Sequence, residues 1–197
     1  VKGSDNSENF SISWNENGLK LLIASDAPSE MTLAVWDMNE SELIYMSATE
    51  LGLALDYSSA GWLPGKDEII YAACKNGATK LYREKVGTDN LPIELPLPEG
   101  WISLIKTVKL KPERIILGWS NLSTPTQILD YDIAERKYNV IASSLPPEFS
   151  LHLADMEFVT YKSFDGRNIP AIQVNPSPEK TLPGNPLIIL IHGGPSW

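Results

Sequence analysis

Residues 185–197 read Asn-Pro-Leu-Ile-Ile-Leu-Ile-His-Gly-Gly-Pro-Ser-Trp, and residues 187–191 within them form an unbroken apolar run. The run is rich in β-branched side chains and is opened by Pro186. A short continuous run of this kind is typical of a strand that is buried on both faces, as in the middle of a mostly parallel sheet. The run therefore predicts a central sheet strand.

A turn rich in glycine follows the run directly and consists of His192, Gly193, Gly194 and Pro195. Glycine adopts backbone conformations that are closed to other residues, and it has no side chain to cover its amide. A glycine turn at the carboxyl end of a buried strand is well placed to aim N–H groups at a negative charge that develops during a reaction. The alternative is a turn that only lets the chain leave the strand.

The segment before this strand reads as two extended stretches around a tight turn. Residues 157–164 alternate loosely, Asp165-Gly166 is a strong two-residue hairpin signal, and residues 168–174 form the returning strand. Upstream, residues 143–147 (Ser-Ser-Leu-Pro-Pro) interrupt the pattern, because proline donates no ladder hydrogen bond. We place the domain boundary there, which divides the chain into residues 1–146 and 147–197.

The first domain repeats a set of short β-rich runs separated by turn residues. Leu21-Leu-Ile-Ala, Ile69-Ile-Tyr-Ala and Ile115-Ile-Leu-Gly align at offsets of 69 − 21 = 48 and 115 − 69 = 46 residues. Four short strands at a period of roughly 40–50 residues indicate β-propeller blades. The expected strands lie at residues 10–14, 19–25, 31–36 and 42–46; at 68–73, 79–83 and 92–95, with 62–65 leading into them; and at 101–106, 114–119, 127–131 and 137–141.

Two other interpretations of the repeat, a β-sandwich and a propeller of the WD-repeat class, have weaker support. A β-sandwich also has short strands, but it gives no reason for a whole four-strand set to recur. Trp36-Asp37 invites comparison with WD-repeat propellers, yet the Gly-His part of that signature is absent. The aromatic residues in the third strands are instead expected to pack between neighbouring blades. Because three blades are too few to close a ring, further blades are expected before Val1.

Residues 187–195 resemble the oxyanion loop of α/β-hydrolases, and the trailing proline makes them similar to the prolyl oligopeptidase family, notably its acylaminoacyl-peptidase and dipeptidyl-peptidase branches. Residues 158–174 with Pro176 are similar to the segment that leads from the propeller into the hydrolase sheet in that family. Residues 123–133 are similar to one of its late blades. The resemblance implies a mostly β fold, with about three four-stranded propeller blades followed by the first strands of an α/β-hydrolase domain.

The resemblance also assigns roles to the residues of the glycine turn. It implies that the backbone N–H of Gly194, with that of Gly193 second, is one of two donors to the oxyanion. His192 would shape the loop and would not act as the triad base, and His152 is expected to be structural. No Gly-x-Ser-x-Gly motif occurs in the 197 residues. The nucleophile and triad are therefore expected downstream, and the chain alone is expected to be inactive.

The implied function is a fragment of a serine peptidase that hydrolyses short peptides by a Ser-His-Asp mechanism, of the aminoacyl- or acylaminoacyl-peptidase type. The expected partners are a short peptide substrate and the remaining propeller blades and hydrolase domain of the same parent. No cofactor is expected. Two alternatives stay open: a non-catalytic propeller that binds or scaffolds other molecules, and an esterase with the same loop.

Composition bounds the other classes of function. The net charge of −9 and pI near 4.7 argue against nucleic acid as a partner, because a basic face supplies most of the affinity there. No apolar run approaches the roughly 20 residues that cross a bilayer. Cys74 is the only cysteine, so it forms no internal disulfide and is expected to be a small buried hydrophobe. The compartment stays open, with the cytoplasm favoured by the single cysteine and the lack of a signal-like start.

Two charged clusters are not expected to form binding sites. Asp37, Glu40 and Glu42 form an acidic stretch that no histidine or cysteine joins, so we expect solvated side chains and no metal site. The basic residues Lys106, Lys109, Lys111 and Arg114 alternate along strand-like sequence. They predict an exposed face in preference to an anion site.

Overall fold

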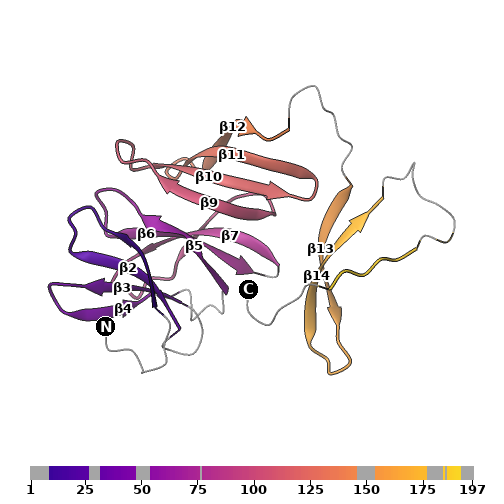
Figure 1. Cartoon of the computed structure of the whole chain (residues 1–197), viewed down its shortest axis with the longest axis horizontal. Coiled ribbons are helices and arrows are strands. Elements are labelled where there is room, and N and C mark those ends of the chain that lie inside the picture. Colours follow the sequence, from indigo (N-terminus) through magenta and orange to yellow (C-terminus); the bar gives the residue numbers. More distant parts are fainter. Residues whose placement is uncertain are drawn as a thin grey trace.

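The computed structural model describes residues 9–26, 32–47, 54–75, 77–145, 154–176, 184 and 186–191. These residues form three four-stranded antiparallel sheets and one two-stranded hairpin, as Figure 1 shows. The mostly β fold predicted from the sequence is confirmed. Within the described ranges no helix has the length and apolar character needed to cross a membrane.

In each four-stranded sheet the strands are neighbours in chain order, so each sheet is a simple meander. The first sheet contains β1 (Asn9–Trp14), β2 (Lys20–Ser25), β3 (Thr32–Asp37) and β4 (Glu42–Tyr45). The second contains β5 (Ala54–Trp62), β6 (Glu68–Lys75), β7 (Ala78–Lys85) and β8 (Ile93–Leu95). The third contains β9 (Trp101–Thr107), β10 (Arg114–Asn121), β11 (Thr124–Asp132) and β12 (Lys137–Ser143). The hairpin consists of β13 (Asp155–Lys162) and β14 (Asn168–Asn175).

The predicted repeat is visible in individual hydrogen bonds. In each four-stranded sheet, the N–H just after the third strand donates to the carbonyl just before the second strand. The three bonds are Met38 N–H to Leu19 O at 3.0 Å, Val86 N–H to Asp67 O at 2.9 Å, and Ile133 N–H to Glu113 O at 2.8 Å. Their donors are offset by 86 − 38 = 48 and 133 − 86 = 47 residues. The three sheets are therefore copies of one blade-like unit.

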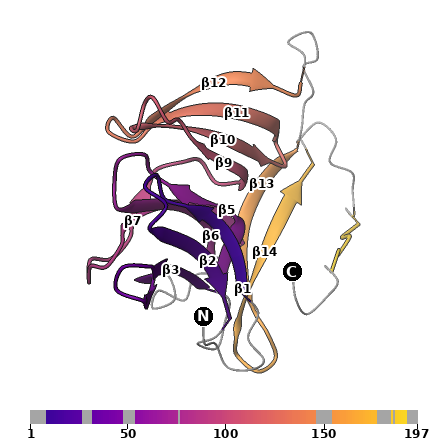
Figure 2. The ribbon, with the colours of Figure 1, turned by 60° about the vertical axis from the view of Figure 1, so that its left-hand side comes forward.

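The second sheet is buried on both faces, because it lies between the other two (Figure 2). Ile69, Tyr71 and Ala73 of β6 pack against the first sheet, while Ile70 and Ala72 pack against the third. All five side chains are 0% exposed. Successive strand residues point to opposite faces, so a strand covered on both sides needs apolar residues at every position. This explains the uninterrupted Ile-Ile-Tyr-Ala-Ala run.

Strand β5 starts far earlier than the sequence predicts, and β11 starts at Thr124 where the prediction has residue 127. The prediction has residues 62–65 leading into the second set, whereas β5 begins at Ala54 and pairs with β6 through a register shift between Asp56 and Ala60. Residues 54–61 read Ala-Leu-Asp-Tyr-Ser-Ser-Ala-Gly and carry little apolar alternation. A bulge disrupts alternation further, because it inserts residues that the partner strand does not oppose.

Cys74 is half-buried, so it is less covered than the sequence predicts.

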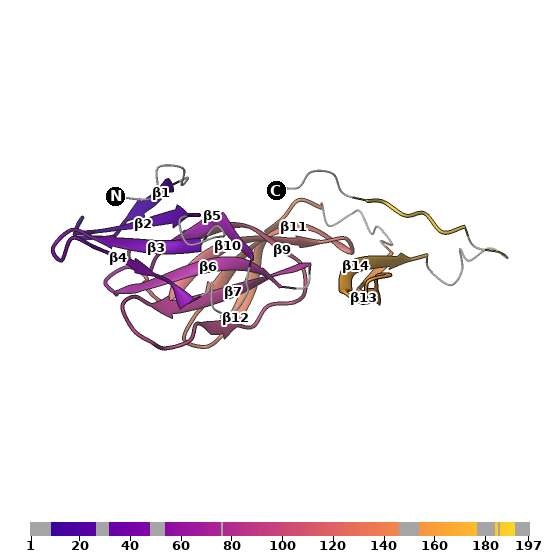
Figure 3. The same ribbon diagram turned by 90° about the horizontal axis from the view of Figure 1, so that it is seen from below.

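The central strand predicted at residues 187–191 is not formed in this structure, so that prediction is wrong here. Residues 186–191 lie in no strand, and Figure 3 shows them in yellow, apart from every sheet. Their apolar side chains are between 73% exposed, at Ile189, and 91% exposed, at Leu190. A strand of this type needs ladder partners at its edges and apolar cover on both faces. No strand among the described residues pairs with it.

Five adjacent exposed aliphatic residues without a charge predict self-association of the 197-residue chain. We expect associated species to increase with protein concentration and Ile189→Lys to reduce them several-fold, because a buried lysine would oppose pairing of the run. Sedimentation velocity over a concentration series measures this. The matched control is Leu110→Lys, at a residue that is 91% exposed but is flanked by Lys109 and Lys111. Equal association of the I189K variant and the unchanged chain would contradict the prediction.

Candidate functional site

The three predicted site residues, Gly194, Gly193 and His192, lie outside the described residues, as does His152. Their roles stay predictions. The described part of the chain shows what lies before the glycine turn, namely the hairpin and its attachment to the sheets. It also shows two hollows on the sheets that the sequence did not predict.

The hairpin was predicted from the Asp165-Gly166 turn, and β13 and β14 pair in continuous register from Asp155↔Asn175 to Lys162↔Asn168. Gly166 has φ 84°, a conformation that favours glycine, and its N–H donates to the carbonyl of Ser163 at 3.0 Å. The predicted hairpin is confirmed, but its connection spans residues 163–167 and is longer than the two-residue turn that Asp165-Gly166 predicts.

The hairpin is attached to one end of the second and third sheets. The ring of Phe158 lies 6.1 Å from that of Trp101, the first residue of β9, at an interplanar angle of 58°. Gly77 has φ 87°, and a side-chain carbon there would lie 3.6 Å from the Phe158 ring. The hydroxyl of Ser123 donates to the carbonyl of Ala154 at 2.8 Å. Contacts from both sheets therefore hold β13 in place.

A hollow of about 650 Å³ opens at the other end of the sheets. Its lining includes the last residue of β1, β5 and β9, which are Trp14, Trp62 and Thr107. The strands β1, β5 and β9 are neighbours, and each is the first strand of its sheet. Because β9 meets the hairpin at Trp101 and the hollow at Thr107, the two features lie at opposite ends of that strand.

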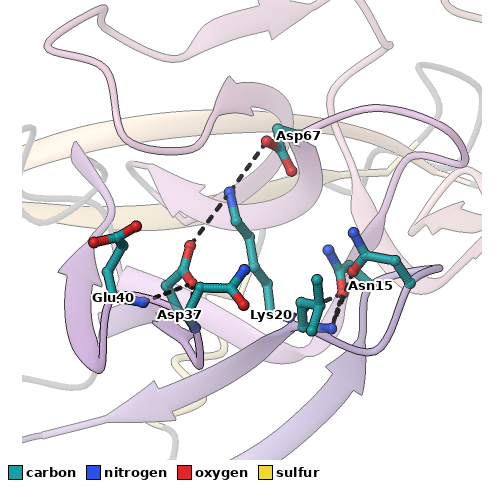
Figure 4. A network of polar contacts seen from close by, with 8 residues as sticks. Asn15, Lys20, Asp37, Glu40 and Asp67 are labelled. Carbon is teal, nitrogen blue, oxygen red and sulfur yellow. Dashed lines mark hydrogen bonds and ion pairs between the residues drawn. The ribbon is translucent and has the colours of Figure 1, made fainter.

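Ion pairs between consecutive sheets border this hollow, which Lys66 and Asp67 line. Lys20 Nζ lies 3.1 Å from Asp67 Oδ2 and 3.7 Å from Asp37 Oδ2, as Figure 4 shows. Lys66 pairs with Glu113 in the same way. Both inter-sheet pairs span 47 residues, from 67 − 20 and 113 − 66. The acceptors Asp67 and Glu113 occupy equivalent positions, since each directly precedes the second strand of its sheet, whereas Lys20 and Lys66 do not.

The structure corrects the expectation of a solvated acidic stretch at one of its three residues. Asp37 is only 7% exposed, because it pairs with Lys20 and its Oδ1 accepts the N–H of Asn39 at 2.9 Å. Glu40 and Glu42 are exposed as expected. In the ranges that the structure describes, no group of three or more His, Cys, Asp or Glu residues could hold a metal ion.

The four residues of the basic cluster also differ in exposure. Lys106, Lys109 and Lys111 are exposed as predicted. Arg114 is half-buried, because its Nε donates to Asp130 Oδ1 at 2.9 Å and its Nη1 to Asp132 Oδ2 at 3.3 Å. This Arg114 network borders a second hollow of about 550 Å³ on the third sheet. In this network Arg114 is paired with two carboxylates, while Arg136 also lines the hollow.

The Arg114 network is expected to make the folding stability of the chain depend on pH in the acid range. Hydrogen bonds from Arg114 lower the pKa of Asp130 below its ordinary value of 3.8. Stability from such a carboxylate is present above its unfolded pKa and is lost as pH falls through the folded pKa. We therefore expect Asp130→Asn to lower the urea midpoint slightly at pH 7 and to have a smaller effect at a pH below that folded pKa. Asp89→Asn, at an exposed position, is the control. An effect of D130N that does not change with pH would contradict this assignment.

A buried polar link between the first two sheets had no signal in the sequence. Glu84 is 3% exposed and accepts hydrogen bonds from the Tyr71 hydroxyl at 2.8 Å and from the Ser47 N–H at 2.7 Å. Burial, reinforced by Glu84, raises the pKa of Tyr71 far above its usual range. The Tyr71–Glu84 pair lines neither hollow, so its role is to join sheets.

Burial also raises the pKa of Tyr131, in β11 of the third sheet, to about 12.

Comparison with solved structures places this arrangement among known folds. The chain is similar to apo prolyl oligopeptidase B from Galerina marginata, with a TM-score of 0.61 and 17% identity over 84% of this chain and 24% of that one. The same protein bound to a 25mer macrocyclization substrate gives 0.59 and 17% over 84% and 23%. One of two prolyl endopeptidases analysed for inter-domain dynamics in catalysis and specificity gives 0.56 and 16% over 87% and 24%.

These similarities show the fold. The chain spans about a quarter of the length of the matched structures. Residues 1–146 make up 146 of 197 residues, or 74%, so a match over 84–87% of the chain extends past the three sheets. The three sheets are thus identified as blades of a β-propeller of the kind in prolyl oligopeptidases. The sequence itself matches no protein-family model and no curated protein.

Proposed function

We propose that this chain is part of a serine peptidase of the prolyl oligopeptidase family, comprising propeller blades and the start of the hydrolase domain. The observation that carries the proposal is the fold match that runs through the blades and beyond them. The β13–β14 hairpin lies in the chain where that family passes from propeller to hydrolase, and it is followed by the His192-Gly193-Gly194-Pro195 motif.

In the proposed mechanism, a serine supplied by the remainder of the polypeptide attacks a peptide carbonyl, helped by a histidine and an aspartate. The N–H of Gly194, with Gly193 as the second choice, donates to the oxyanion that forms. His192 shapes the loop. The attachment of β13 through Phe158 supports this assignment, because it anchors the segment that leads to the loop.

For the substrate we propose short peptides cleaved near the amino terminus, in the aminoacyl- or acylaminoacyl-peptidase manner. The proline that follows the glycine pair supports this choice. The matched structures are of prolyl oligopeptidases and a prolyl endopeptidase, so cleavage after proline is the competing specificity. An esterase with the same loop is a further alternative within the same chemistry.

The test is active-site labelling of the full-length gene product with a fluorophosphonate probe, which reacts with an activated serine. We expect one labelled serine and turnover of p-nitroanilides. Rates with the p-nitroanilides of acylated alanine, free alanine and glycyl-proline then compare the acylaminoacyl, aminoacyl and prolyl specificities. Matching p-nitrophenyl esters test for esterase activity. The 197-residue chain, which lacks a Gly-x-Ser-x-Gly motif, is the control and should stay unlabelled. A full-length product without labelling or turnover would favour a non-catalytic propeller.

A further inference from the structure

The second hollow borders the end of the third sheet that lies away from the hairpin. β9 contacts the hairpin through its first residue, Trp101, whereas its last residue, Thr107, pairs with Ile115. Ile115 also pairs with Tyr131, so Asp132 and the turn that follows it lie at the Thr107 end of the sheet. Asp132 lines the hollow. The hollow is therefore separate from the segment that leads to the glycine turn.

The charged side chains around the second hollow leave a net positive charge, although the whole chain has a net charge of −9. They are three basic and two acidic residues, Arg114, Arg136, Lys137, Asp132 and Glu135, with a formal sum of 3 − 2 = +1. Arg114 is held by two carboxylates, and Lys137 Nζ lies 3.9 Å from Glu135 Oε2. Arg136 forms an ion pair with no acidic residue in the described ranges. Its guanidinium is therefore the cation that the hollow offers to a ligand.

The turn that carries Arg136 does not itself require an arginine. Met38 and Ile133 donate equivalent hydrogen bonds in the first and third sheets. Three residues further along, from 41 − 38 and 136 − 133, Ser41 and Arg136 both have φ 55°. This left-handed conformation is readily adopted by glycine, asparagine and aspartate and costs other residues free energy. The turn thus fixes the backbone in both sheets, while a costly residue at such a position is one indication of a functional side chain.

Apolar groups complete the lining of the second hollow. Pro96, Leu97 and Pro98 come from the connection between β8 and β9, and Tyr138 comes from β12. Tyr138 is 38% exposed, so its ring is accessible. Binding sites for small molecules combine apolar and aromatic groups with a few polar ones, in clefts of roughly 300–1,000 Å³. With a volume of about 550 Å³, the second hollow has the size and the mixed lining of such a site.

A buried hydroxyl without a partner lies beside the second hollow. Tyr131 is 0% exposed, and its hydroxyl has no hydrogen-bond partner in the part of the chain that the structure describes. Its strand neighbour Asp132 and its ladder partner Tyr138 both line the hollow. Burial is the main cause of the raised pKa of Tyr131, and the charges of Arg136 and Asp132 also act on it. A buried polar group of this kind indicates a missing partner, such as a water, an ion or a ligand.

We propose that the second hollow binds a carboxylate attached to an apolar group, as in the C-terminal residue of a peptide. The guanidinium of Arg136 donates two parallel hydrogen bonds to the carboxylate, a geometry for which arginine is suited. The apolar group packs on Tyr138 and the neighbouring prolines. The net charge of +1 favours a monoanion, because a phosphate dianion would be repelled by Asp132 and Glu135. This site goes beyond the proposed function and does not rest on it.

Saturation-transfer NMR titration of the 197-residue chain with N-acetyl-phenylalanine tests the proposal. This probe has the carboxylate, the apolar side chain and the amide of a peptide's last residue. We expect saturable binding, and a dissociation constant about tenfold or more higher for the neutral N-acetyl-phenylalaninamide, because the hydrogen bonds to a charged group are lost. N-acetyl-glycine should also bind more weakly, and inorganic phosphate should not displace the probe at equal concentration.

The variant Arg136→Asn removes the guanidinium and keeps a residue that tolerates the left-handed conformation. We expect it to raise the dissociation constant of N-acetyl-phenylalanine about tenfold or more. The matched control is Lys85→Asn, at an exposed lysine that does not line the hollow, and it should leave the constant unchanged. A urea midpoint close to that of the unchanged chain shows that the R136N variant is folded.

The proposal would be overturned by the absence of saturable binding, by equal binding of the acid and its amide, or by equal binding to the R136N variant and the unchanged chain. Displacement of the probe by phosphate at equal concentration, or equal binding of N-acetyl-glycine, would likewise show a site that recognises charge alone. The readout does not depend on catalysis. A gene product that fails fluorophosphonate labelling while its Arg136 site binds the probe would refute the peptidase and retain this site.

Discussion

Replacing Gly194 by proline in the full-length gene product is expected to lower kcat for a peptide substrate by about 10²–10³-fold, the effect of losing one oxyanion donor. Proline has no N–H, so the substitution removes the proposed donor while leaving the rest of the loop sequence unchanged. The proposed donor acts on charge that develops in the transition state, so KM should change much less than kcat. Steady-state kinetics with the preferred p-nitroanilide measures both constants.

The matched control is Gly194→Ala, which keeps the N–H but adds a side chain. If the donor is the cause, the G194A variant retains much more of kcat than the G194P variant. Equal losses in both variants would show that the loop tolerates no side chain there and would leave Gly194 without a role as donor. Because Gly193 is the second choice, the same pair of substitutions at Gly193 decides between the two amides.

The propeller could be predicted from the sequence because its signals are local and repeated. Turn residues such as Asn17-Gly18 and Asn76-Gly77 separate runs of strand-forming residues, and the same set recurs three times. The strand whose start differs most from the prediction, β5, contains a register shift and little alternation, so its pattern does not follow the period of two on which strand prediction relies.

Charges were harder to predict because their partners lie far away in the chain. Asp37 looked solvated in the sequence, yet it is covered and paired with Lys20, which also reaches Asp67 in the second sheet. Nothing within a window around Asp37 announces that arrangement. The same holds for Glu84, whose partner Ser47 is 37 residues away in the chain. Local sequence identifies ionisable residues, whereas burial and pairing depend on the tertiary fold.

The run at residues 187–191 shows that a strong local pattern is not sufficient to predict burial. Its composition describes a buried strand, but burial is a property of the surroundings and not of the run itself. In this structure the surroundings are absent among the described residues, and the same side chains are exposed. The glycine motif beyond it lies outside the described residues, so its role stays a prediction that rests on the family resemblance.

The second sheet provides the other large expected effect, because both of its faces are covered. We expect Ile69→Ala and Ile70→Ala each to lower the free energy of unfolding by about 2–5 kcal/mol, the usual range for deleting a buried aliphatic side chain. Ile69 packs with the first sheet and Ile70 with the third, and both are 0% exposed. Equilibrium unfolding in urea, followed by far-UV circular dichroism, measures each loss.

The pair of variants also separates the propeller from a β-sandwich. A sandwich strand buries alternate residues and leaves the intervening ones toward solvent, so one of two adjacent substitutions would be tolerated. A blade between two others buries both adjacent residues, so neither substitution should be tolerated. Leu110→Ala, at a residue that is 91% exposed, is the control and should change stability by less than about 0.5 kcal/mol. A small effect at either isoleucine, comparable to that control, would contradict the stacking of three blades.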